Sequence, residues 1–289
     1  MDFYLSAILQ GLCLSAMAFG IFISMKIFNI PDISTDGAYT LGGVISGFFI
    51  SQSYNGFAIV GLVMVGGALA GAATGFIHTK LKVNALLAGI LVMTALYSIN
   101  LSILGQSNLP LLNFPTLFTV INVFQNPTQN TFLIVATIIL VLLIIVSYVL
   151  KSDFGLAMRA TGNSQTMVRA LGVNTDNMKI IGLAIANALT ALSGYLMTQL
   201  QGFADINMGI GIVIVGLGSV IMGETLINYF AITSVAKMLL TVILGAIVFQ
   251  LVLAFALSLG INPNLLKLIT AAFVLLIVGL PRFIFKKAE

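Results

Sequence analysis

The sequence predicts an all-α polytopic membrane protein with about nine transmembrane helices, in a range of eight to ten. Hydrophobic residues make up 60% of the chain and charged residues only 7%, whereas a soluble domain carries roughly 25% charged residues. The apolar residues occur in repeated runs, each long enough to cross a hydrocarbon layer of about 30 Å as a helix. Helices are favoured over a β-barrel because each one satisfies its own backbone hydrogen bonds in lipid.

The predicted helices are nine apolar segments that together form a single transmembrane domain, residues 1–289. In chain order they are about 4–25, 36–54, 57–79, 84–104, 131–150, 180–200, 209–227, 235–259 and 264–280. The second and the seventh are short and rich in glycine, and polar residues precede both of them. We call these polar stretches the first break (residues 31–39) and the second break (residues 202–209).

The basic residues predict an orientation with the N-terminus outside and the C-terminus in the cytosol. In this orientation all Lys and Arg residues except Lys267 lie on the cytosolic side, as the positive-inside rule requires. The cytosolic set consists of Lys26, Lys80, Lys82, Lys151, Arg159, Arg169, Lys179, Lys237, Arg282, Lys286 and Lys287. The formal net charge of +4 is therefore explained by the membrane topology, and no nucleic acid partner is needed.

A faint internal repeat relates the two halves of the chain. A shift by 173 residues aligns Asp32 with Asp205 and brings the two breaks into correspondence. The predicted repeats, about 1–104 and 180–280, begin at the first and the sixth predicted helix, so they have opposite orientations in the membrane. Inverted repeats with interrupted helices are typical of transporters, whose pathway lies at the repeat interface.

Polar residues in or beside the breaks and helices are candidates for lining a solute pathway. Burial of a carboxylate in a bilayer costs several kcal/mol, so such a group usually faces a cavity, a partner or the membrane edge. The alternative is structural: Asp side chains cap the helices that follow them, and amide side chains join neighbouring helices. Both interpretations stay open for the candidates Asp32, Thr35, Asp36, Tyr39, Asn84, Asn187, Gln201, Asp205 and Asn207.

Residues 151–179, which we call the polar segment, form the only long polar interruption of the apolar pattern. Apolar side chains are spread through this segment, and Gly155, Gly162 and Gly172 divide it into about two short helices. A plain linker would be richer in Ser, Pro and charge. The composition therefore favours a surface that docks on another protein.

The sequence lacks the motifs of several enzyme classes. It contains no P-loop, no HExxH motif and no GxSxG elbow, so neither ATP hydrolysis nor a nucleophile–base pair is expected in this chain. Cys13 is the only cysteine, which excludes an intrachain disulfide and argues against a metal site. We expect a protein that is not an enzyme and that has no cofactor.

The polar segment carries a recognisable pattern. Its run GLAMRATGNSQTMVRALGV resembles the cytoplasmic loop of permease subunits of ABC importers, in the branched-chain amino acid and ribose permease family. The following GLAIANALTALSGYL is similar to the next membrane helix of that family. The stretches IPDISTDGAYTLGG, NALLAGILVMTALYSINL and QGFADINMGIG resemble the subgroup described as tryptophan or tyrosine permeases, and the resemblance covers nearly the whole chain.

This resemblance implies a coupling role for the polar segment, in which it lodges in a groove of an ATPase. The residues of the matching pattern are Gly155, Arg159, Gly162, Asn163, Arg169, Leu171 and Gly172. Unlike many other ABC importers, the chain has Leu156 and Ala157 where an acidic residue opens the loop motif.

The resemblance also implies the partners and the location of the protein. The expected assembly is a permease homodimer in a bacterial plasma membrane, with cytosolic ABC ATPase subunits and an extracytoplasmic solute-binding protein. It would import a small polar solute, with an amino acid as the expected class and an aromatic amino acid as the solute that the subgroup suggests. The alternatives are a secondary transporter or channel that works without an ATPase, and a structural scaffold. A docking segment argues against the first, and two corresponding polar breaks argue against the second.

Overall fold

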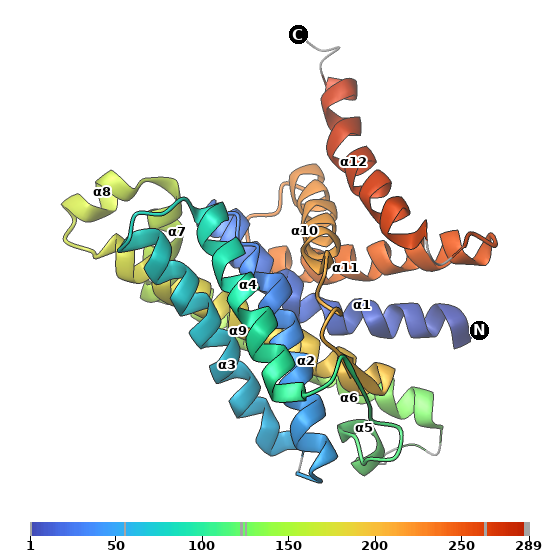
Figure 1. Ribbon diagram of the computed structural model, residues 1–289. Helices are drawn as coiled ribbons and strands as arrows, with labels where there is room; N and C mark the ends of the chain where they lie inside the picture. The colour runs from blue at the N-terminus through green and yellow to red at the C-terminus, as the bar shows by residue number, and fades with distance from the viewer. Residues whose placement is uncertain (1, 55, 122–123, 125, 263–264, 286–289) are drawn as a thin grey trace.

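The computed structural model describes residues 2–54, 56–121, 124, 126–262 and 265–285, and it is almost entirely helical (Figure 1). The first part consists of α1 (Asp2–Ile21), the π-helical turn η1 (Phe22–Ile27), α2 (Ser34–Ser51), α3 (Gly56–Thr79) and α4 (Ala85–Leu104). The middle part consists of β1 (Asn108–Pro110), α5 (Leu117–Val120), α6 (Pro127–Lys151), α7 (Asp153–Asn163) and α8 (Gln165–Ala170). The last part consists of α9 (Thr175–Gln201), β2 (Phe203–Asp205), α10 (Ile212–Tyr229), α11 (Val235–Ser258) and α12 (Leu266–Phe285).

Seven helices in the described part of the chain are long and apolar enough to cross a membrane, which confirms the polytopic all-α prediction. They are α1 with η1, α3, α4, α6, α9, α10 and α11. The difference from the predicted nine lies in α2 and α12. Helix α2 has 18 residues with several Ser, Thr and Gly, and most of its side chains are buried by other helices. A helix surrounded by protein does not need a continuous apolar surface, so its sequence is less hydrophobic than that of a lipid-facing helix. Helix α12 has 20 residues, and the part of it that can be compared, Leu266–Ile277, is a shorter apolar helix.

Helices α1 and α9 form the centre of the bundle. They contact each other, and most of the residues of both are buried. Helix α9 also contacts α2 and α3, whereas α1 also contacts α6, α10 and α11. Glycines permit the closest of these approaches: a Cβ on Gly71 of α3 would overlap the carbonyl oxygen of Leu183 in α9, and a Cβ on Gly42 of α2 would overlap that of Ala191.

The contacts on the two sides of this central pair correspond to one another. Helix α3 lies against α9, and α11 lies against α1. Helix α2 contacts α3 and α4, and α10 contacts α11 and α12. Both α2 and α10 have 18 residues, and a non-helical stretch precedes each of them.

A two-stranded sheet connects segments that are far apart in the sequence. Strand β1 pairs antiparallel with β2, with Asn108 opposite Asp205 and Pro110 opposite Phe203. The second break is therefore attached to the connection between α4 and α6. This sheet and α5 lie at one end of the bundle, whereas α7 and α8 lie at the other, and α9 runs between the two ends (Figure 1). We call these the sheet end and the α8 end.

Candidate functional site

Helix α7 of the polar segment is fixed to the bundle by two glycines. A Cβ on Gly155 would overlap the carbonyl oxygen of Val149 in α6, and a Cβ on Gly162 would overlap that of Ile27 in η1. Met158 between them is fully buried. Two of the predicted coupling residues thus face the bundle and place α7 in contact with α6 and η1.

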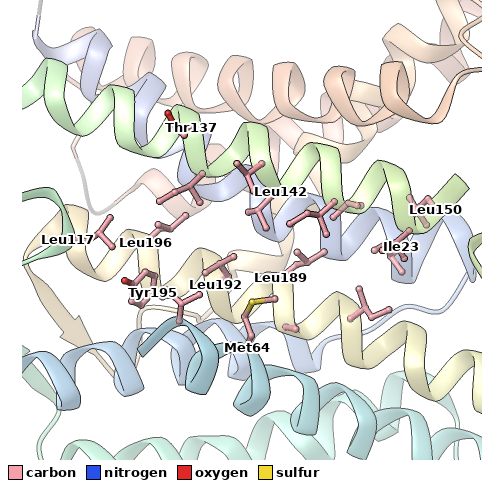
Figure 2. Close-up of a pocket in the computed structure, with 18 of the residues that line it drawn as sticks. Ile23, Met64, Leu117, Thr137, Leu142, Leu150, Leu189, Leu192, Tyr195 and Leu196 are labelled. Atoms are coloured by element: carbon pink, nitrogen blue, oxygen red, sulfur yellow. The ribbon is translucent and has the colours of Figure 1, made fainter. Parts of the chain in front are cut away.

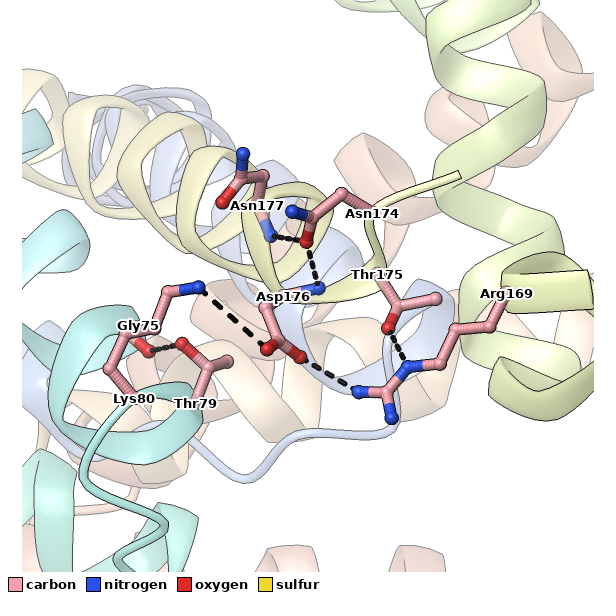
Figure 3. Close-up of polar contacts among 8 residues, drawn as sticks. All are labelled: Gly75, Thr79, Lys80, Arg169, Asn174, Thr175, Asp176 and Asn177. Carbon is pink, nitrogen blue, oxygen red and sulfur yellow. Dashed lines mark hydrogen bonds and ion pairs between the residues drawn. The ribbon is translucent and has the colours of Figure 1, made fainter. Parts of the chain in front are cut away.

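Helix α8 is held against the start of α9 by hydrogen bonds and ion pairs of Arg169, Thr175 and Asp176 (Figure 3). Arg169 at the end of α8 donates hydrogen bonds from Nη2 to Asp176 Oδ1, at 2.9 Å, and from Nε to Thr175 Oγ1, at 2.6 Å. Lys80, just after α3, lies with its Nζ 3.8 Å from Asp176 Oδ2. Asn174 caps α9 by accepting from the backbone N–H of Asp176. Asp176 therefore connects the end of α8 to α9 and to the end of α3.

The polar segment exposes large apolar side chains on its surface. Leu156, Met167 and Leu171 are 58%, 64% and 72% exposed, respectively. Asn163 and Gly172 are also exposed, and Gly172 has a φ of +83° with open space around its Cα. Exposed large apolar side chains on a segment whose backbone is anchored to the bundle are typical of a protein interaction surface.

Arg159, the remaining predicted coupling residue, lines a cavity of about 290 Å³ between α7, η1, α10 and α11. Asn163 lines the same cavity. Lys26 of η1 and Glu224 of α10 form an ion pair here. The Nε atom of Arg159 is buried and has no hydrogen-bond partner among the described residues.

The first break is held by a buried network centred on Asp32. Asp32 Oδ1 accepts from the backbone N–H and the hydroxyl group of Ser34, at 2.8 and 2.6 Å. Asp32 Oδ2 accepts from Asn187 Nδ2 of α9, at 2.7 Å. Thr35 donates from its hydroxyl group to the Asp32 carbonyl oxygen, at 3.2 Å. This network combines the two predicted roles of such residues, since Asp32 caps α2 and also joins it to α9.

Asp36 links the first break to the second. Its carboxylate accepts from the backbone N–H groups of Gly211 and Val213, at 2.9 Å each. These groups belong to the start of α10, whose own N-cap residue Gly211 supplies no side chain. The first turn of α2 therefore caps α10, and the negative charge lies at the positive end of that helix.

A cavity of about 500 Å³ opens at the sheet end, between α1, α2, α9, β2, α10, α11 and α12. We call it the polar cavity, because charged and amide side chains stand among its apolar lining. Four predicted pathway residues line it: Tyr39, Gln201, Asp205 and Asn207. The other five lie elsewhere. Asp32, Thr35 and Asn187 form the buried network, and Asp36 caps α10 and lines a smaller cavity beside α4. Asn84 caps α4 by accepting a hydrogen bond from Leu86 N–H, at 2.9 Å.

The sequence prediction did not include several polar residues of this cavity, namely Gln10, Gln250, Lys267 and Thr270. Lys267 had a signal in the sequence, because it is the one basic residue on the outer side of the predicted topology. The two glutamines and the threonine are single polar residues within apolar helices, a pattern that also fits helix–helix hydrogen bonds.

A second cavity of about 500 Å³ lies between α3, α6 and α9 (Figure 2). Its walls are almost entirely apolar, and the side chains labelled in Figure 2 include Leu142, Leu189 and Leu192. Transfer of a polar or charged solute into such a site without hydrogen-bond partners is unfavourable by several kcal/mol. This cavity is therefore unsuited to a polar solute, and the polar cavity is the better candidate.

The fold is that of a multi-pass membrane protein, and comparison with known proteins identifies its family. The model of the family described as branched-chain amino acid transport system, permease component, matches residues 3–279. The chain therefore belongs to this family of transport permeases, and it is a transport component rather than an enzyme.

The relatives of the chain include permeases with different named solutes. A tyrosine transport system permease protein of Clostridioides difficile is 39% identical over 271 residues, which cover 94% of this chain and 88% of the relative. An uncharacterized protein of Rickettsia prowazekii is 33% identical, with 93% and 94% covered. A ribose import permease protein of Haemophilus influenzae is more distant, at 25% identity, with 67% of this chain and 60% of the relative covered.

Proposed function

We propose that this chain is the membrane-spanning permease subunit of an ATP-driven ABC importer for an aromatic amino acid, with tyrosine as the first candidate. The observation that carries this proposal is the similarity, along nearly the whole chain, to a permease named for tyrosine transport. The polar cavity supports it, because a volume of about 500 Å³ is within the usual range of small-molecule sites and its lining combines charged, amide and apolar side chains.

In this proposal the polar segment docks on a cytosolic ABC ATPase, which hydrolyses the ATP. The exposed Leu156, Met167 and Leu171 provide the apolar contact surface, and the anchors of α7 and α8 transmit the movement of the ATPase to the bundle. Two permease subunits form a homodimer in a bacterial plasma membrane. An extracytoplasmic binding protein delivers the solute to the sheet end, with the N-terminus outside and the C-terminus in the cytosol.

Transport would proceed by alternating access between two inverted repeats, about 1–104 and 180–280. The corresponding contacts of α2 and α10 support this relation, since each follows a break and packs on the equivalent neighbours. The first break then forms the cytosolic gate and the second break the outer gate. The hydrogen bonds from Gly211 and Val213 to Asp36 connect the two breaks, so a displacement of one break would displace the other.

Docking can be tested by crosslinking in a Cys13→Ser background. Single cysteines at Leu156, Met167 and Leu171 should crosslink to the ATPase, because these side chains point away from the bundle. Met158 and Val168, at 0% and 2% exposure, are matched controls in the same two helices and should not react. Free labelling of the three exposed positions by water-soluble reagents in the assembled complex would contradict docking at this surface.

Import can be tested in vesicles that contain the permease, its ATPase and its binding protein. Uptake of labelled tyrosine should require hydrolysable ATP on the ATPase side. Uptake that continues without nucleotide would instead favour a secondary transporter or a channel. ATP-dependent uptake of a different solute would keep the importer and change its substrate.

A further inference from the structure

Lys267 occupies a position that neither helix stability nor membrane topology explains. It is the second residue of α12, where the partial positive charge of the helix N-terminus disfavours a cation. In the proposed orientation it is also the one basic residue on the outer side, against the usual bias. A binding role would explain a lysine at this position.

The polar cavity contains an unpaired charge of each sign. Among the described residues that line it, Lys267 is the one cation and Asp205 is the one anion. Neither takes part in the ion pairs found in the described part of the chain. Asp205 is held by hydrogen bonds from Asn207 N–H, at 2.6 Å, and from Asn108 Nδ2, at 3.4 Å, so its carboxylate is positioned without a basic partner.

The cavity has a second positive group, the N-terminus of α10, and Asp36 already occupies it. The N-terminus of α10 directs the N–H groups of Gly211 and Val213 at Asp36, at 2.9 Å each. Lys267 forms no ion pair with Asp36 in the described part of the chain. Because Asp36 is satisfied by the backbone, Lys267 is left as the cation that an anionic group in the cavity would meet.

We infer that Lys267 binds the carboxylate and Asp205 the ammonium group of an amino acid in the polar cavity. Phe203 and Met208 line the same cavity and provide apolar surface for the solute's side chain. Charge-assisted hydrogen bonds to both groups, which are attached to the same α-carbon, would select a zwitterion over an amine or an acid of the same shape. This inference rests on the proposed function and names the recognition site within it.

The test compares three probes on the purified permease in lipid nanodiscs: L-tyrosine, tyramine, which lacks the carboxylate, and 3-(4-hydroxyphenyl)propionate, which lacks the ammonium group. The wild type should bind tyrosine about tenfold or more tightly than either analogue. Lys267→Gln should lose the preference for tyrosine over tyramine but keep the preference over the acid. Asp205→Asn should show the opposite pattern.

Lys237→Gln is the matched control, because Lys237, like Lys267, is an exposed lysine in the first turn of its helix but does not line the polar cavity. It should keep both preferences. A folded Lys267→Gln variant that still prefers tyrosine over tyramine would overturn the inference, as would a wild type that binds the two equally. These outcomes leave the importer itself intact, whereas nucleotide-independent uptake with unchanged probe preferences would overturn the proposed function and leave this site standing.

Discussion

At the scale of single residues, the carboxylates of Asp32 and Asp36 accept hydrogen bonds from backbone N–H groups and from polar side chains. Asp32 accepts from Ser34 N–H and from Asn187, and Asp36 accepts from two N–H groups of α10. A carboxylate removed from water needs such donors, and a helix N-terminus needs acceptors. Each contact therefore satisfies two groups that are both costly to leave unpaired.

Replacement of Asp36 should destabilise the fold through α10. Asp36→Ala leaves the N–H groups of Gly211 and Val213 without their acceptors, which costs about 1–3 kcal/mol. For a chain of this size we expect the Tm to fall by about 2–4 °C per kcal/mol. Asp36→Asn should have a smaller effect, because it retains one acceptor oxygen. Unfolding can be followed with a thiol-reactive dye, since Cys13 is fully buried in the fold.

Asp153→Ala is the control for this experiment. Asp153 is also in the first turn of a helix, α7, but it is exposed, so its loss should cost only a few tenths of a kcal/mol. Equal shifts in Tm for Asp36→Ala and Asp153→Ala would contradict the role of Asp36 as the cap of α10.

The sequence could indicate which residues cap helices, but only where cap and helix are adjacent. Asn84 directly precedes the helix that it caps. Asp32 lies two residues before Ser34 and accepts a hydrogen bond from the N–H group of Ser34. The partner of Asp36 begins at Gly211, far along the chain, and no local spacing encodes that contact. Part of the candidate site, namely the acidic and amide residues of the two breaks, was thus accessible from the sequence. The remaining polar residues of the cavity, and the grouping into a buried network, a cap and a polar cavity, needed the fold.

At the scale of elements, hydropathy located the long helices well because lipid exposure imposes a continuous apolar run. The glycines of the polar segment predicted about two short helices, and the structure has two, α7 and α8, although Gly155 and Gly162 lie within α7 and the residue between the two helices is Ser164. Hydropathy gave no sign of the β1–β2 pair, because a strand of three residues is too short to show a periodic pattern. That pair determines where Asp205 lies, so one side of the polar cavity was not predictable.

Two glycines of the polar segment should respond differently to substitution. Gly162→Leu should displace α7, because even a Cβ at this position would overlap the carbonyl oxygen of Ile27. We expect a lower Tm and a loss of ATP-driven uptake. Gly172→Ala meets no neighbouring atom and should cost only the strain of a positive φ, about 1–2 kcal/mol.

Thermal stability and uptake, measured on the same preparations, would separate the two effects. Membrane insertion should be intact in both variants, since neither glycine lies in a transmembrane helix. If Gly162→Leu kept the wild-type Tm and uptake, the contact between α7 and η1 would not be required for coupling.

At the scale of the whole molecule, α9 connects the two candidate regions. It begins beside Arg169 and Asp176 at the α8 end, carries Asn187 of the buried network, and ends at Gln201 in the polar cavity. Its 27 residues span about 40 Å. In the proposed coupling, a movement of the polar segment would reach the first break in two ways, through α9 and through the contact of α7 with η1.

The inverted-repeat proposal makes a prediction about two loops that occupy equivalent places. The loop after α2 contains Ser53 and the loop after α10 contains Ser234, and both serines are exposed. If the repeats are inverted, these loops lie on opposite sides of the membrane, with Ser53 outside and Ser234 in the cytosol. In a Cys13→Ser background, Ser53→Cys should react with a membrane-impermeant maleimide added to intact cells, whereas Ser234→Cys should react only after the membrane is opened. Serine-to-cysteine changes at exposed positions alter little in size, so stability should be preserved in both. Reaction of both cysteines from the same side would exclude an inverted relation between the repeats, and with it the assignment of the two breaks to opposite gates.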